Sequence, residues 1–205
     1  MWAERFSGGK IVRGETDFAG HTELARSVRR GDLKKVTELL KAGTPRKFVG
    51  IRQESLLLLA IESDNPAVLD VLLKESDLDV NFPNNSGVTP IMRAAASNQV
   101  MMLMSLIESK ASLAAKDRDG MAAIHYAVMG GSRAITDLLI RNKANLEAKM
   151  SNGMRPLSLA AGEGSLGLFK HSLLAAPTFL LSIIKVEISF IWPLLGITRN
   201  LLKRF

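Results

Sequence analysis

The sequence predicts an all-α solenoid of helix-turn-helix units joined by hairpin loops, with an apolar C-terminal extension. Two observations predict this fold. A short block recurs three times at one fixed spacing, and each of the first two copies is followed by a second apolar run. That run has helical spacing, most clearly in AITDLLIRNKANLEAK. The chain also has no cysteine, which excludes disulfides and thiolate metal sites and fits a reducing compartment.

The recurring block reads NNSGVTPIMRAAASNQ, then DRDGMAAIHYAVMGGS, then MSNGMRPLSLAAGEGS. Its turn glycines, Gly87, Gly120 and Gly153, are separated by 33 residues each time. An aliphatic residue and a small pair follow each glycine, so the first helices of neighbouring units can approach closely. One unit cannot bury both of its faces, and we therefore expect its stability to come from stacking on its neighbours.

Two weaker copies lie upstream. SLLLLAIESDNPAVLDVLLKESDLDVN fits with one extra residue near Asp77, which gives a local spacing of 34. ELARSVRRGDLKKVTELLKAGTP fits a first unit, with Gly31 between its helices and Gly43 closing the second helix. Four leucines occupy equivalent places on the second helices, where we expect them to fill the layer between units: Leu39, Leu72, Leu106 and Leu139.

These blocks resemble the ankyrin repeat family. The resemblance rests on residues 87–95, 120–127 and 153–161 and covers about residues 21–169. The Thr-Pro pair that begins the first helix of a repeat is intact only at Thr89-Pro90, and the histidine that the family often places two residues later is present only as His125. We therefore expect a less rigid array than an idealised one.

The expected organisation has three parts: an irregular N-terminal arm over residues 1–20, an ankyrin repeat domain of about five repeats over 21–176 with atypical first and last units, and an apolar extension with a basic end over 177–205. The formal charge of +7 comes from the two ends of the chain, while the middle is mildly acidic. Because a nucleic-acid-binding domain carries its basic surface on the folded body, nucleic acid is not an expected partner.

Catalytic, metal and cofactor sites are not predicted. Asp117, Asp119 and His125 lie close in sequence, but no second histidine stands at ligand spacing. The resemblance implies a structural role for His125, in which it bonds backbone and hydroxyl groups at the start of a helix. SGGKIVRG lacks the spacing of a phosphate-binding loop. We therefore expect a protein that is not an enzyme.

The resemblance implies a non-enzymatic scaffold that binds another protein, of unknown identity, in a concave groove lined by hairpin tips and by one flank of each first helix. Within it, methionines can adapt to a partner, Arg93 and Arg118 can bind carboxylates, and Tyr126 can act as an anchor. The residues that match the groove positions are Asn85, Ser86, Val88, Arg93, Ala96, Ser97, Arg118, Asp119, Met121, Tyr126, Met129, Gly130, Ser151, Asn152 and Met154.

Two segments keep alternative interpretations. RSVRRGDLKK suits either a solvated face that caps the first repeat or a contact with phosphates or lipid headgroups. LLAAPTFLLSIIKVEISFIWPLLG, residues 173–196, is long enough to span a membrane, but Lys185 and Glu187 lie near its centre. It also suits a packed apolar tail, or a chain ending with no role of its own. The expected location is the cytoplasm or the nucleus, with a membrane-associated adaptor as the alternative.

Overall fold

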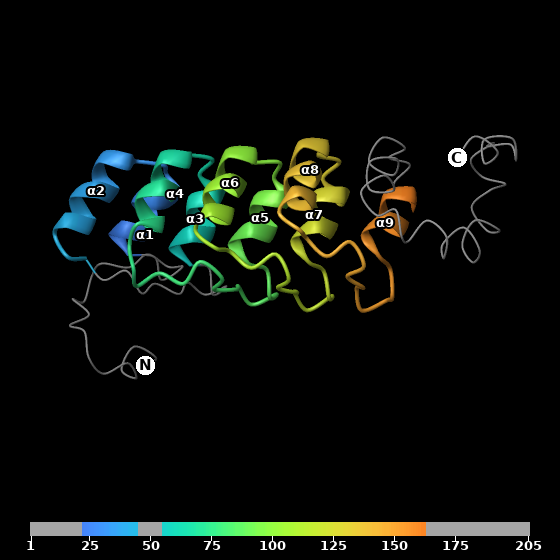
Figure 1. Cartoon of the computed structure of the whole chain (residues 1–205). Coiled ribbons are helices and arrows are strands. Elements are labelled where there is room, and N and C mark those ends of the chain that lie inside the picture. Colours follow the sequence, from blue (N-terminus) through green and yellow to red (C-terminus); the bar gives the residue numbers. More distant parts are fainter. Residues whose placement is uncertain (1–21, 45–54, 163–205) are drawn as a thin grey trace, which may run out of the picture.

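The computed structural model describes residues 22–44 and 55–162, which form nine helices and no strand. The helices alternate between two layers that run side by side along the array, with hairpin loops projecting along one edge (Figure 1). The predicted all-α repeat solenoid is therefore confirmed for this part of the chain. The inner layer contains α1 (Glu23–Arg29), α3 (Leu56–Glu62), α5 (Pro90–Ala96), α7 (Ala123–Met129) and α9 (Pro156–Gly162).

The outer layer completes four helix pairs within the described residues, and α9 begins a fifth unit. Each inner helix packs on the next inner helix, and each outer helix on the next outer helix. The starts of α3 and α5 are 34 residues apart, which places the predicted extra residue between the second and third units. The outer helices are α2 (Leu33–Lys41), α4 (Pro66–Leu73), α6 (Val100–Glu108) and α8 (Arg133–Arg141).

Capping residues decide where the helices begin. Thr22 and Ser55 accept hydrogen bonds from the backbone three residues later, at the starts of α1 and α3. A proline occupies the first turn of α4 and α5, where its missing N–H is not needed. Polar side chains at these positions satisfy backbone donors that would otherwise lack a partner, which stabilises each short helix by about 1 kcal/mol.

The turn between inner and outer helices requires a left-handed residue. Gly31 and Gly131 have φ angles of 70° and 65°, and Asp64 and Asn98 occupy the same conformation at 53° and 57°. Glycine adopts this region freely, and Asp and Asn tolerate it better than other side chains. The turn is therefore conserved in geometry along the array although its residue changes.

A ladder of side-chain hydrogen bonds joins consecutive units at these turns. Asn65 Nδ2 donates to the carbonyl oxygen of Gly31 at 2.9 Å, and Gln99 Nε2 donates to that of Ile61 at 2.8 Å. The Ser132 hydroxyl donates to Asn98 Oδ1. Asn65, Gln99 and Ser132 each precede an outer helix. Asn65 and Ser132 cap that helix and also reach back to the preceding unit, whereas Gln99 only reaches back.

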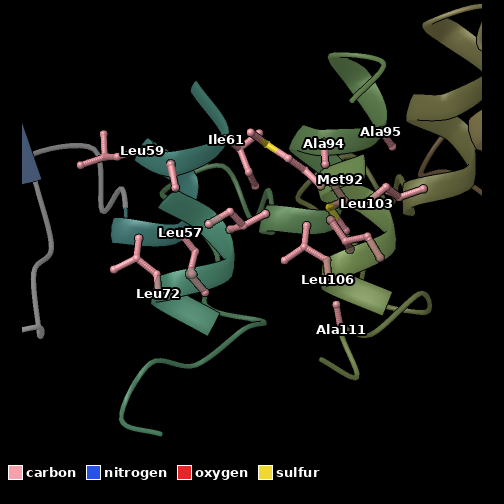
Figure 2. Close-up of a cluster of buried hydrophobic side chains, with 14 of the residues drawn as sticks. Leu57, Leu59, Ile61, Leu72, Met92, Ala94, Ala95, Leu103, Leu106 and Ala111 are labelled. Carbon is pink, nitrogen blue, oxygen red and sulfur yellow. The ribbon is translucent and has the colours of Figure 1, made fainter. Parts of the chain in front are cut away.

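The hydrophobic core is continuous across the units from α1 to α8, and Figure 2 shows part of it, while Val128 and Ala160 form a separate small cluster at α9. Leu57 and Ile61 of α3 meet Met92 of α5 and Leu103 of α6 in one buried cluster. The predicted small residues of the inner layer are also buried, with Ala94, Ala95 and Ala127 at 0% exposure. Large side chains thus fill the layer between units, while alanines allow the inner helices to pack closely.

The leucines predicted at equivalent outer-helix positions are buried in three of four cases. Leu72, Leu106 and Leu139 are fully buried. Leu39 is only partly buried against the core, and the neighbouring Leu40 is the buried residue of α2.

The basic residues of the first unit differ in their surroundings, because some form ion pairs and others do not. Arg29 lies 3.9 Å from Glu62 of the next inner helix, and Lys35 lies 3.7 Å from Glu23 within its own unit. Arg30 and Lys34 are exposed. Arg29 is exposed as well, so most of this cluster faces solvent while Arg29 and Lys35 also form ion pairs with neighbouring helices.

Several predictions fall outside the described residues: the N-terminal arm over 1–20, the apolar segment 173–196, and the extension over 177–205. Within residues 22–44 and 55–162, none of the helices combines the length and the apolar character needed to cross a bilayer.

Candidate functional site

The hairpin tips are joined to one another by main-chain hydrogen bonds. The N–H of Arg118 donates to the carbonyl oxygen of Ser86 at 3.1 Å, and the N–H of Ser151 donates to that of Asp119 at 2.8 Å. Three consecutive tips therefore form a connected edge. Such an edge presents its side chains at fixed spacing, which lowers the entropy lost when a partner binds.

Each tip is also closed internally by an Asn or Asp side chain. Asn84 Oδ1 accepts from the N–H groups of Ser86 and Val88 at 2.9 and 3.0 Å. Asp117 Oδ1 accepts from Asp119 and Met121 in the same way, at 2.9 and 2.8 Å. These side chains replace backbone partners inside a tight turn. Asn84 and Asp117 are thus residues of the site that sequence reasoning did not single out for this role.

Tyr126 connects the second hairpin to α7. Its hydroxyl donates to Asp117 Oδ2 at 2.5 Å. Burial of the ring raises the pKa of Tyr126 above its usual range, and the Asp117 carboxylate raises it further. The hydroxyl of the predicted anchor is therefore already hydrogen-bonded. What remains for contact with a partner is the exposed part of its half-buried side chain.

Most predicted groove residues lie at the surface. Arg93 and Tyr126 are partly buried, as are Val88 and Met154. The prediction for Met121 is wrong in this respect, because its side chain is buried at 7% exposure. Met121 closes the hairpin by accepting from the N–H of Asp117, and the chain then enters α7 with this side chain facing inward. The exposed predicted residues are Asn85, Ser86, Ala96, Ser97, Arg118, Asp119, Met129, Gly130, Ser151 and Asn152.

Four residues of the middle units form a compact patch on adjacent inner helices. Arg93 and Ala96 come from α5, and Tyr126 and Met129 occupy the equivalent places on α7, which packs directly against it. Met129 is 51% exposed, which is high for a large apolar side chain. We call these four residues the central patch. It combines an arginine, an aromatic ring and an exposed thioether.

His125 is a structural residue. Its side chain is fully buried, Nδ1 accepts from the N–H of Ala122 at 3.0 Å, and Nε2 donates to the carbonyl oxygen of Ala148 at 3.1 Å. Both ring nitrogens are therefore used by main-chain groups of this unit and of the following loop. No hydroxyl takes part, because position 122 is alanine. In the described residues no group of three potential metal-binding side chains is present.

Met92 occupies the position of His125 in the preceding unit. Its sulfur atom accepts from the N–H of Thr89 at 3.4 Å, and the buried Thr89 hydroxyl has no hydrogen-bond partner. A thioether is a weak acceptor, and an unsatisfied buried hydroxyl destabilises a fold. This helix start is therefore held less firmly than that of α7.

We expect the free energy of unfolding to fall as the pH is lowered from 7.5 to 5.5, partly because of His125. Burial lowers the pKa of His125 below its usual 6.5, so the folded ring stays neutral where the unfolded ring takes up a proton. One such proton reduces stability by up to about 1.4 kcal/mol per pH unit below pH 6.5.

Urea unfolding at several pH values measures this effect. The His125→Gln variant provides the control, because it lacks this titrating group and keeps the other two histidines of the chain. Its stability should be lower at pH 7.5 but should depend less on pH. Equal pH slopes for the two proteins would contradict the assignment.

Stacked helix pairs, hairpins linked along one edge and an exposed inner-helix flank together define an ankyrin repeat protein. A family model described as "Ankyrin repeats (many copies)" matches residues 91–140. The family model and the fold together identify this array as ankyrin repeats.

Curated relatives agree with this assignment. The chain is 28% identical to the human transient receptor potential cation channel subfamily A member 1 over 119 residues, which is 58% of this chain and 11% of the relative. It is 29% identical to mouse neurogenic locus notch homolog protein 1 and to human neurogenic locus notch homolog protein 2, each over 119 residues, 58% of this chain and 5% of the relative. The matched region is thus a small part of each relative. Ankyrin repeats are generally protein–protein interaction modules without enzymatic activity.

Proposed function

We propose that this chain is a non-enzymatic scaffold that captures a partner protein on the surface formed by its linked hairpin tips and the central patch. The observation that carries the proposal is the pre-organised edge of three tips, joined by the bonds from Arg118 to Ser86 and from Ser151 to Asp119. Side chains on this edge and on α5 and α7 are exposed along one continuous side of the array. The absence of cysteine supports a reducing compartment such as the cytoplasm as its location.

A comparison of two surfaces tests the proposal. The full chain is expressed in cells with a proximity-labelling tag, beside a groove variant, Ala96→Arg with Met129→Asp, and an outer-face variant, Met101→Asp with Met104→Asp. All four positions are exposed, with Met101 at 65% and Met104 at 40%, so the substitutions change the surface and leave the core intact. Labelled proteins are identified by mass spectrometry, and candidate partners are then purified and titrated directly.

The expected result is a purified partner that binds the unmodified chain and the outer-face variant equally, and the groove variant at least about tenfold more weakly. Circular dichroism and urea midpoints must first show that both variants fold. If the outer-face variant loses binding while the groove variant retains it, the interaction surface lies on the outer helices and the proposal is wrong.

A further inference from the structure

Arg93 carries the central patch's unpaired charge. Its side chain is partly buried, and its Nε atom is buried with no hydrogen-bond partner. It forms no ion pair with any residue in the described part of the chain. A partly desolvated guanidinium is stabilised when a carboxylate forms paired hydrogen bonds with it. The patch therefore contains an unmet requirement for an anion.

The carboxylate that is hydrogen-bonded to Tyr126 does not meet this requirement. Asp117 accepts three hydrogen bonds, two from the backbone of its own hairpin and one from Tyr126. These donors hold its carboxylate in the hairpin and offset its charge. Arg93 is still close enough for its charge to oppose the rise in the pKa of Tyr126. Arg93 and Tyr126 thus share one edge of the patch, with the arginine left open to a partner.

The other edge of the patch is apolar. Met129 and Ala96 lie three residues beyond Tyr126 and Arg93 on their helices, and both are exposed. The next residue is Gly130, which has no side chain that could cover Met129. Three residues of helix correspond to a rise of about 4.5 Å. A methionine in such a position adapts its shape to an apolar group of a partner.

We infer that the central patch recognises a segment of the partner that presents an aspartate or glutamate next to an apolar side chain. The carboxylate binds Arg93 beside the Tyr126 ring, and the apolar group packs on Met129 and Ala96. The rise between the two edges suits side chains two positions apart in an extended segment, because these point to the same face. This inference rests on the proposed function, since it names the chemistry of the partner at the same surface.

A charge-reversal selection tests the inference. A phage-displayed library of linear peptides is selected on the full chain and on its Arg93→Glu variant. The matched control is Arg141→Glu, which reverses the charge of an exposed arginine at the end of the outer helix α8, away from the proposed binding surface. Because the Arg93 side chain makes no hydrogen bond or ion pair in the described part of the chain, reversal of its charge should leave the fold intact. Circular dichroism and urea midpoints check this for each variant.

The unmodified chain and Arg141→Glu should select Asp or Glu two positions from Leu, Ile, Met or Phe, while Arg93→Glu should select Lys or Arg at the acidic position. For one selected peptide, replacing its carboxylate by the amide should weaken binding to the unmodified chain by about 10- to 100-fold. The same replacement in the peptide should change its affinity for the Arg93→Gln variant only slightly.

Three outcomes overturn the inference. If the selected peptides depend on Met129 but carry no acidic residue, the proposed groove function stands and the assignment of Arg93 is wrong. If the selected peptides bind Met129→Asp and Arg93→Glu as tightly as they bind the unmodified chain, they bind elsewhere. Both the inference and the proposed function are then contradicted. A selection that enriches no sequence from a diverse library also counts against both.

Discussion

Gly120→Ala should lower the free energy of unfolding by about 3 kcal/mol. Gly120 has a φ of 74°, where a side chain costs about 1–2 kcal/mol. A methyl group at this position would also lie 2.8 Å from the backbone nitrogen of Ser151, the atom that donates to Asp119 in the tip ladder. That contact cannot be relieved without moving the next hairpin, and such overpacking adds about 1–3 kcal/mol.

Gly153→Ala is the matched control. Gly153 has a similar φ of 82°, but no described atom lies within 4 Å of the position that its Cβ would take. Its substitution should therefore lower the free energy of unfolding only by the cost of a side chain at a positive φ, about 1–2 kcal/mol. Urea unfolding of the two variants measures the difference directly. If both lose the same stability, contact between the hairpin tips contributes nothing measurable, and the pre-organised edge loses its energetic basis.

Leu106→Ala should lower the free energy of unfolding by about 3 kcal/mol as well, for a different reason. Leu106 is fully buried in the cluster shared by α3, α4, α5 and α6 (Figure 2). Removal of a buried leucine side chain loses its transfer free energy and leaves a cavity that the neighbouring units fill only in part.

Leu39→Ala provides the comparison for that prediction. Leu39 stands at the same register position on α2 but is only partly buried, so its truncation should reduce stability by about 1 kcal/mol. Chemical denaturation followed by helix circular dichroism distinguishes the two cases. Equal losses would mean that position within the array does not govern the contribution of a unit, contrary to nearest-neighbour stacking.

Much of the groove could be predicted from sequence, because residues at the same register position occupy equivalent places in successive units. Arg118 and Asp119 were expected at a tip and are exposed there. The Asp117 bond to Tyr126 could not be predicted, since the two residues belong to different elements and the bond depends on how the hairpin folds back on α7. Repeat register predicted Met121 as a groove residue, whereas the hairpin turns its side chain inward.

Sequence by itself determined the period, the helix pairs and the left-handed turns of this protein. These features follow from local requirements: apolar spacing of a helix, capping side chains and glycine at a positive φ. Tertiary structure alone decided that Gly120 meets a neighbouring hairpin while Gly153 meets no described atom, and that Leu106 is buried more deeply than Leu39. It also decided that Arg93 is left without an ion pair among the described residues. Each of these depends on contacts with another unit or another element, and such contacts exist only once the repeats have stacked.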